Sequence, residues 1–289
     1  MSDVGGEPGA APERYVDLHM HSTASDGAVA PADVVAAARR AGLSAIALTD
    51  HDTIDGVAAA QAAGVSLGVR VIAGVELSAV DEGAEIHVLG LHLAHPEHMA
   101  AALDELKESR RDRAKLIVER LNSLGIPVTL EAVYAAADGG AVGRPHIARA
   151  LVAGGWARDF REAFDRWLGN GKPACIEKRT VTFEEAARLI HDAGGLAVYA
   201  HPGGAASRAE LEDLASLGLD AVEVRHPSHT ADEIVRLSAF TSELGLVPSG
   251  GSDWHGASEG YRALGSMKVS ADWLARQDAR VRQRMEQLA

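Results

Sequence analysis

Residues 15–21 read Tyr-Val-Asp-Leu-His-Met-His, a short apolar run that ends in two side chains able to bind a metal or a phosphate. Six further apolar runs along the chain end in the same way. In chain order, the residues that close the seven runs are His19 with His21, His51, Glu76, His87, His201, His226, and Asp253 with His255. In a parallel barrel the carboxyl ends of all strands meet on one face, where active sites lie. The pattern therefore predicts a metal centre with hydrolytic chemistry on that face.

The seven runs are the predicted strands of this barrel. They cover residues 15–19, 44–50, 69–77, 85–91, 196–201, 221–226 and 246–253. Runs that are apolar throughout are typical of parallel strands buried on both faces. Helices are predicted in the connections, among them residues 31–40, which begin with Pro31, and residues 52–63, which end at Gly64. The alternation predicts an α/β fold built on a seven-stranded β/α barrel.

A helical insertion is predicted between the fourth and fifth strands, which about a hundred residues separate. Ordinary connections between neighbouring strands are far shorter. The predicted helices of this gap cover residues 97–124, 130–137, 144–153 and 159–168. We therefore predict that residues 94–174 form a helical subdomain, a lid or wall that supplies substrate contacts but no metal ligands. The barrel segments, residues 14–93 and 175–289, flank it. Further surface helices are predicted at residues 183–193, 231–244 and 271–288.

Composition limits the function. The chain has 289 residues and is 47% hydrophobic but only 4% aromatic, so a core of Ala, Val, Leu and Ile is predicted. The net charge of −13 argues against an extended nucleic-acid surface, but not against a phosphorylated substrate, because bound cations reverse the sign locally. The single cysteine, Cys175, excludes a disulfide within the chain and a cysteine-based zinc site.

Neither a membrane protein nor a secreted one is expected. No run reaches the roughly 18 apolar residues that a membrane span needs. Residues 1–13 are rich in Gly, Pro and Ala and have no apolar core, so they are predicted to be a disordered tail and not a signal peptide. The expected location is the cytoplasm. The sequence does not indicate an oligomeric state.

The first two histidines form a predicted clamp, because positions i and i+2 of an extended chain face the same way. Asp26, on the following loop, can reach the same face. Glu76 closes an apolar strand, where an unpaired carboxylate is costly and a metal is a good partner. Other interpretations stay open for single residues. His87 alone is typical of a hydrogen-bonded core histidine, and residues 49–53 also fit a junction in which Asp52 or Thr53 caps a helix while Asp50 supports a ligand histidine.

Together these residues indicate a site for more than one metal ion, which no single residue indicates alone. The nine candidate ligands are six imidazoles and three carboxylates: His19, His21, Asp26, His51, Glu76, His87, His201, Asp253 and His255. Such a set can hold two or three cations. It suits manganese, iron or zinc better than calcium or magnesium.

The series resembles the polymerase and histidinol phosphatase (PHP) family, whose nine ligand positions are all present here in order. The resemblance implies a distorted seven-stranded barrel with three divalent transition metals, Mn²⁺ first, with Fe²⁺ or Zn²⁺ as alternatives. It implies that Glu76 bridges two metals. It further implies one site completed by His19, His21 and Asp253, a second by His87 and His201, and a third by Asp26, His51 and His255.

Two further segments, residues 143–148 and 223–229, resemble the metal-dependent phosphoesterase branch of that family. This branch implies hydrolysis of nucleoside monophosphates or 3',5'-bisphosphates, or trimming of RNA from its 5' end. Arg144 is the predicted phosphate clamp, because a guanidinium binds phosphate through a fork of donors; the alternative is a surface arginine. His226 is predicted to bind phosphate or to protonate the leaving oxygen, and His229 either does the same or caps a helix. His201 is predicted to be catalytic as well as a ligand.

The predicted function is therefore a metal-dependent phosphoesterase acting on nucleotides or short RNA 5' ends, with water as the attacking group. A histidinol phosphate phosphatase is the alternative among enzymes, and the long insertion and residues 226–229 count against it. A non-catalytic accessory module that only binds metal is the alternative outside enzymes. Degraded ligand positions would support that module, and none is degraded.

Overall fold

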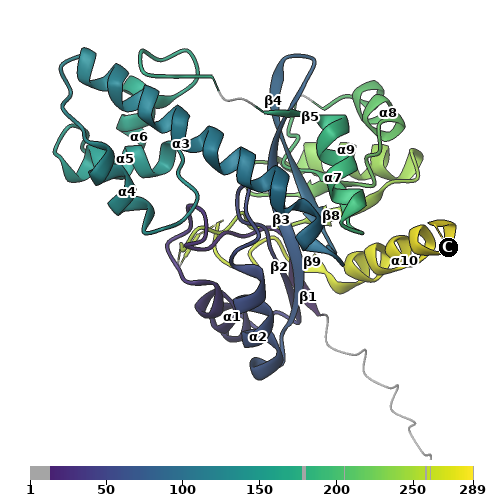
Figure 1. Ribbon diagram of the computed structural model, residues 1–289. Helices are drawn as coiled ribbons and strands as arrows, with labels where there is room; N and C mark the ends of the chain where they lie inside the picture. Colours follow the sequence, from purple (N-terminus) through teal and green to yellow (C-terminus); the bar gives the residue numbers. More distant parts are fainter. Residues whose placement is uncertain (1–13, 178–179, 205, 258, 261, 289) are drawn as a thin grey trace, which may run out of the picture.

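The computed structural model describes residues 14–177, 180–204, 206–257, 259–260 and 262–288 (Figure 1). The tail predicted at residues 1–13 lies outside the described residues. Among the helices that are described, none combines the length and the apolar character needed to cross a membrane.

The strands form one curled sheet. They are β1 (Tyr15–Asp17), β2 (Ala45–Leu48), β3 (Arg70–Asp81), β4 (Ala84–Leu91), β5 (Val181–Thr182), β6 (Leu196–Tyr199), β7 (Ala221–Arg225), β8 (Val247–Gly250) and β9 (Val269–Ser270). Their order is β8-β7-β6-β4-β3-β2-β1-β9, with β5 beside β3. The two sides of the sheet meet, because the Leu18 N–H donates to the Gly250 carbonyl (3.1 Å) and Met20 pairs with Trp254. The sheet is therefore a nearly closed barrel, and the predicted α/β barrel is confirmed.

All seven predicted strands are present, and the described residues add β5 and β9. Each of these has two residues, too few to carry a recognisable pattern. The expectation of a wholly parallel barrel is wrong for β4, which pairs antiparallel with both β3 and β6. The cause is a two-residue turn in which Glu82 and Gly83 both have positive φ, the conformation of a tight hairpin. β3 and β4 thus run as a long hairpin beyond the other strands, and His87 lies within β4 and not at its end.

The helices largely follow the predictions. They are α1 (Pro31–Arg40), α2 (Val57–Leu67), η1 (Pro96–Met99), α3 (Ala100–Ser123), α4 (Leu130–Ala137), α5 (Arg144–Ala153), α6 (Phe160–Ala163), η2 (Phe164–Leu168), α7 (Phe183–Asp192), α8 (Arg208–Ser216), α9 (Ala231–Glu243) and α10 (Ala271–Leu288). α8 was not predicted, although Ser207 and Glu210 form a capping box at its start. α2 begins five residues later than predicted (57 against 52), because Asp52 adopts a φ of 49° and interrupts the helix.

Helix α3 joins two hydrophobic cores. Its first half packs Leu103 and Leu106 into the barrel core. Its second half packs Ile117 and Leu121 into a separate core shared with α4, α5 and η2. Figure 1 shows α3 extending from the barrel to the group formed by α4, α5 and α6. The division of the chain at residues 94 and 174 stays a prediction, since one helix contributes to both cores.

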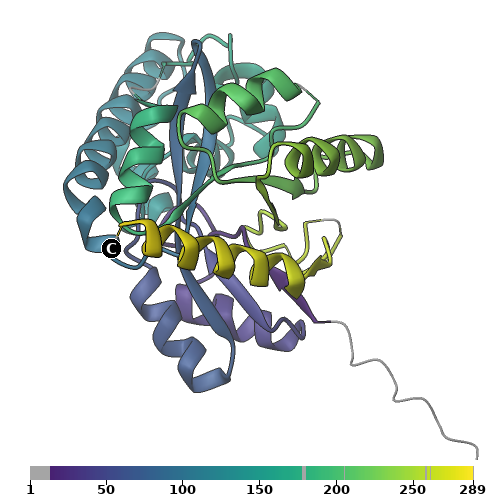
Figure 2. The same cartoon turned by 90° about the vertical axis from the view of Figure 1, so that its right-hand side faces the viewer.

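Helix α10 covers the amino ends of the strands and runs across the view in Figure 2. Asp278 accepts two hydrogen bonds from Arg70 at the start of β3 (2.6 and 2.7 Å). Gln277 donates to the Pro248 carbonyl in β8 (3.2 Å). Arg284 pairs with Asp220 (3.0 Å), one residue before β7. The opposite end of the barrel, where the strands finish, is where the candidate ligands gather.

Candidate metal centre

Glu76 is the hub of the site. This residue of β3 is only 1% exposed. Five imidazoles contact its carboxylate. Oε2 lies 3.2 Å from His19 Nε2, 3.1 Å from His21 Nε2 and 3.2 Å from His51 Nδ1, while Oε1 lies 2.7 Å from His87 Nδ1 and 3.3 Å from His201 Nε2. Because the two oxygens face different sets of histidines, the carboxylate is placed to join two neighbouring cations.

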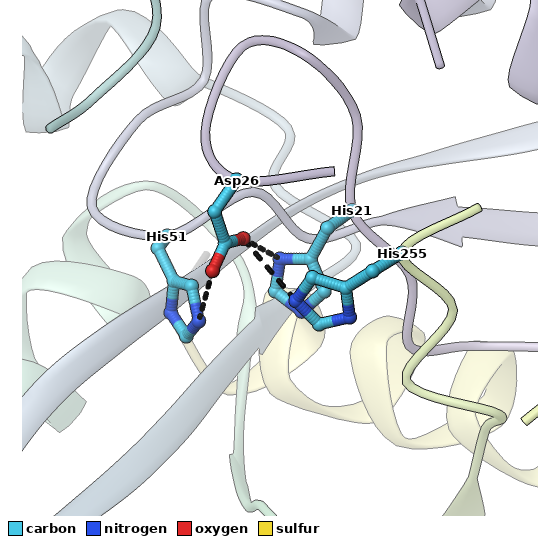
Figure 3. Close-up of side chains that lie close together, drawn as sticks. All are labelled: His21, Asp26, His51 and His255. Atoms are coloured by element: carbon cyan, nitrogen blue, oxygen red, sulfur yellow. Dashed lines mark ion pairs between the residues drawn. The ribbon is translucent and has the colours of Figure 1, made fainter. Parts of the chain in front are cut away.

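A second group surrounds Asp26 on the loop after β1. Its Oδ1 lies 3.2 Å from His255 Nε2 and 3.8 Å from His21 Nδ1, and its Oδ2 lies 3.9 Å from His51 Nε2. Figure 3 shows the three imidazoles turned toward this carboxylate from three different segments of the chain. A parallel β-bridge pairs the backbones of His51 and Glu76 and keeps this second group next to the Glu76 carboxylate.

Asp253 completes the cluster from the segment after β8. Its Oδ1 lies 3.2 Å from His21 Nε2 and 3.5 Å from His19 Nε2. Its Oδ2 faces His226 Nε2 at 3.5 Å and pairs with Arg262. The structure thus brings all nine predicted ligands into one continuous cluster, and places His226 at its edge.

The donor set fits divalent cations. Both nitrogens of His21 and Nδ1 of His51 are buried without a hydrogen-bond partner among the described residues. Burial opposes ionisation of Glu76, but the surrounding imidazoles, His51 first, outweigh it and hold the pKa of this carboxyl well below its usual value. The pKa values of Asp26 and Asp253 are likewise held well below their usual value by nearby histidines, against burial. Burial lowers the pKa of His51 to about 3, so this ring is neutral and has a lone pair for a metal.

Glu223 is a buried residue of the site that the sequence analysis missed. Its side chain is fully buried in β7, and it accepts a hydrogen bond from His19 Nδ1 (3.0 Å) and another from the His201 backbone N–H (2.7 Å). The first bond directs Nε2 of His19 toward Glu76. The signal was available, because Glu223 interrupts the apolar run 221–224 just as Glu76 interrupts its own run.

Two buried aspartates hold the ligand-bearing loops. Asp50 accepts from the Ser22 backbone N–H (2.7 Å) and from the Ser25 hydroxyl (2.7 Å), so it anchors the loop of Asp26 and supports no histidine directly. Asp17 accepts from the Ser252 backbone N–H (2.9 Å) and so anchors the loop of Asp253. Both loops are therefore held by hydrogen bonds between protein groups.

Neither predicted cap forms at the junction after β2. One carboxylate oxygen of Asp52 accepts from the Ser78 backbone N–H (3.0 Å), and the other pairs with Arg110 of α3 (2.5 Å). Thr53 accepts from the Asp55 N–H (3.2 Å), within the turn that precedes α2. This junction therefore joins the end of β2 to the hairpin and to α3.

Three arginines lie together at the junction of α3, α5 and the β3–β4 hairpin. Arg110 pairs with Asp52, the residue that follows His51. Burial and the charges of Arg144 and Arg110 lower the pKa of Arg113 to about 10. Arg144 donates to Asn170 (2.8 Å) and lies 3.9 Å from Glu85, and no recorded contact joins it to a candidate ligand. We call Arg110, Arg113 and Arg144 the arginine cluster.

Two further histidines of the predicted segments, His229 and His146, make hydrogen bonds to the backbone. Both nitrogens of His229 are engaged, since Nδ1 donates to the Val224 carbonyl (3.0 Å) and Nε2 accepts from the Gly203 N–H (3.1 Å). His146, undecided from the sequence, accepts from the Gly143 N–H (3.0 Å) at the start of α5. One further arginine was missed: Arg149 donates to the Asp26 carbonyl (2.5 Å) and ties α5 to the ligand loop.

Known proteins resemble this chain along most of its length. Residues 17–173 match the PHP domain family. A 5'-3' exoribonuclease of Haemophilus influenzae is 39% identical over 246 residues, which are 83% of this chain and 89% of that protein. A 3',5'-nucleoside bisphosphate phosphatase of Chromobacterium violaceum is 35% identical over 257 residues, 86% of this chain and 90% of that protein. A solved structure from Bifidobacterium adolescentis, described as a metal-dependent phosphoesterase, superposes with a TM-score of 0.86 at 32% identity, over 93% of this chain and 97% of its own.

Proposed function

The chain belongs to the PHP domain family and is a metal-dependent phosphoesterase, and from this premise we propose that it hydrolyses phosphate esters of nucleotides or of short RNA 5' ends. The family resemblance drawn from the nine motif residues is confirmed. The observation that carries the proposal is the Glu76-centred cluster together with the arginine cluster, whose Arg110 pairs with Asp52, the residue after His51. The Glu76-centred cluster would hold cations, and the arginine cluster would hold the phosphate groups of a nucleotide or of an RNA end.

The nine clustered residues are the proposed metal ligands. We propose three divalent cations, Mn²⁺ first, with Glu76 shared between two of them. When bound, such cations supply Lewis-acid charge and lower the pKa of water, so that it attacks phosphorus at neutral pH. The geometry also suggests a grouping by distance, since His21, Asp26, His51 and His255 offer ligand atoms that lie close to one another.

The arginine cluster is the proposed site for substrate phosphates. Arg144 was proposed from the sequence, and the structure adds two neighbours of the same charge, Arg110 and Arg113. Guanidinium groups match phosphate through paired donors, and three of them beside two carboxylates, Glu85 and Asp52, leave net positive charge. This local excess offsets the overall charge of −13.

We propose that the helical insertion forms one wall of the active site. The Ala141 N–H, in the loop between α4 and α5, donates to the Ala24 carbonyl (2.9 Å). A Cβ on Gly140 would lie 2.5 Å from the Thr23 carbonyl oxygen, so only glycine permits this close approach. The insertion thus rests on the loop that carries Asp26, next to the proposed ligands.

A cytoplasmic location is part of the proposal. It fits nucleotide and RNA substrates, and it fits a chain whose one cysteine, Cys175, is unpaired.

The test is hydrolysis by the purified full chain, stripped with a chelator and reloaded with Mn²⁺. The substrates are a nucleoside 3',5'-bisphosphate, a nucleoside monophosphate, a 5'-phosphorylated trinucleotide, histidinol phosphate and p-nitrophenyl phosphate. We expect one of the first three to give the highest kcat/KM, and the stripped protein to be inactive. Preference for histidinol phosphate, or no turnover of any substrate by protein that holds its metal, would overturn the proposal.

A further inference from the structure

We propose that Arg262 and His226 form a donor pair that holds a phosphoryl oxygen of the substrate on the side of Asp253 away from the cations. His226 is then a substrate contact and not a tenth metal ligand. The inference rests on the proposed function, since it places two more residues around the phosphate. Arg262 was not recognised in the sequence.

Asp253 separates two regions of the site. Its Oδ1 faces the imidazoles of His19 and His21, which also contact Glu76. Its Oδ2 faces His226 Nε2 at 3.5 Å and pairs with Nη1 of Arg262. One oxygen is therefore directed at proposed ligands and the other at two hydrogen-bond donors.

The hydrogen bonds of His226 decide which of its nitrogens carries the proton. The Ser228 backbone N–H donates to Nδ1 (3.1 Å), and the Ser228 hydroxyl is 2.7 Å from the same atom. A backbone N–H is always a donor, so Nδ1 must accept, and in the neutral ring Nε2 carries the hydrogen. That Nε2–H is buried without a hydrogen-bond partner among the described residues. A protonated Nε2 has no lone pair for a metal, although His226 lies close enough to His19 and Asp253 to suggest a metal site.

Two of the proposed ligand histidines, His19 and His255, show the opposite arrangement. His19 donates from Nδ1 to Glu223, and His255 donates from Nδ1 to the Asp253 carbonyl (2.9 Å). In the neutral form of both rings Nε2 has the lone pair, and it points at a carboxylate of the cluster, Glu76 or Asp26. The hydrogen bonds made by the other ring nitrogen thus separate metal-binding histidines from a hydrogen-bonding one within the same site.

Arg262 supplies the charge that His226 lacks. Its guanidinium is a cation that offers five N–H donors. Its one recorded side-chain contact in the described part of the chain is with Asp253, and 42% of its side chain is exposed. Most donors are therefore free for an anion. Arg262 lies after β8, in the barrel part of the chain. Arg262 and His226 would therefore bind the substrate from the side of the barrel, and the arginine cluster would bind it from the side of the insertion.

The first measurement is binding, without turnover. Full-length Mn²⁺-loaded protein is titrated with inorganic phosphate by calorimetry, for the wild type and for Arg262→Gln, Arg262→Lys, His226→Leu and His226→Gln. Arg208→Gln is the control, because among the described residues Arg208 pairs with the exposed side chains of Glu212 and Glu243. We expect Arg262→Gln and His226→Leu to weaken phosphate binding about ten- to a hundredfold, the effect of a lost charge-assisted hydrogen bond. His226→Gln, which retains a donor, should recover most of the affinity.

The second measurement is metal content by elemental analysis, with folding monitored by circular dichroism. We expect every variant to hold as much Mn²⁺ as the wild type. Loss of metal from His226→Leu that His226→Gln does not restore would make His226 a ligand and overturn the proposal. If His226→Leu does not fold, His226→Gln and the two Arg262 variants still test the proposal. Wild-type phosphate affinity in Arg262→Gln would overturn it. Normal phosphate binding in a protein that hydrolyses none of the nucleotide substrates would contradict the proposed function alone.

Discussion

Replacing Glu223 by glutamine tests how the protein directs a metal ligand without touching the metal. Glu223 is buried, and its carboxylate accepts from His19 Nδ1 (3.0 Å) and from the His201 N–H (2.7 Å). Glutamine has the same shape but only one accepting oxygen. If that oxygen keeps the bond to His201, the amide N–H groups face the N–H of His19, and two donors oppose each other.

The least costly relief is a change of tautomer in His19. Nδ1 then accepts from the amide, the proton moves to Nε2, and the nitrogen that faces Glu76 at 3.2 Å loses its lone pair. Loss of such a supporting bond typically lowers metal affinity about 10- to 100-fold, which corresponds to roughly 1.4–2.7 kcal/mol. We expect Glu223→Gln to fall in this range, with normal circular dichroism.

The assay is Mn²⁺ affinity, measured by titration of chelator-stripped protein. Glu184→Gln is the matched control, because Glu184 is exposed in the first turn of α7. An affinity for the tightest Mn²⁺ within twofold of the wild type would refute the reasoning. It would mean that His19 keeps its ligand tautomer without Glu223, or that His19 does not bind metal.

Three more predictions follow from the same geometry. Glu76→Ala should lose more metal than any other single ligand variant, because in the proposed centre two cations share this carboxylate. Elemental analysis showing more than one Mn²⁺ per chain in that variant would contradict this prediction. Arg144→Ala should lower kcat/KM about ten- to a hundredfold with unchanged metal content; wild-type kinetics would make Arg144 a surface residue. Burial opposes protonation of His21, but the carboxylates of Asp253 and Glu76 outweigh burial and raise the pKa of His21 to about 10. At pH 8 the metal-free ring is therefore protonated, and Mn²⁺ must displace that proton. Calorimetry in buffers of different ionisation enthalpy should show this release, and the affinity should rise with pH; no buffer dependence would contradict the assignment.

Much of the fold is predictable because its signal is local. Each buried strand needs an apolar run, and each long helix between strands needs a start, an end and an apolar stripe, all readable within about ten residues. The seven main strands and the long helices of the insertion are of this kind. Two unpredicted elements carry little local signal, since β5 and β9 have two residues each and exist only through pairing with β3 and β1. The unpredicted helix α8 differs, because the capping box of Ser207 and Glu210 at its start was readable in the sequence.

The antiparallel strand was not predictable in the same way. An apolar run buried on both sides has the same composition whether it runs parallel or antiparallel to its neighbours. The direction of β4 is decided by the turn at Glu82 and Gly83 and by pairing with β6, more than a hundred residues away. As a result His87 reaches Glu76 from inside a hairpin and not from a strand end.

By itself, the sequence predicted the set of proposed metal ligands, because histidines and carboxylates recur at the ends of successive apolar runs, although each residue alone also fits another role. The tertiary structure alone decided how each of them is used. In our proposal, whether a histidine binds a metal or donates to a substrate depends on the partner of its other nitrogen, which is Glu223 for His19 but the Ser228 backbone N–H for His226. Glu223 is 204 residues from His19 along the chain, and Arg110, Arg113 and Arg144 come from two helices that meet only in the folded protein. Sequence reports the donors and acceptors that a chain has, whereas a hydrogen bond requires them within about 3 Å of each other, and only folding sets that distance.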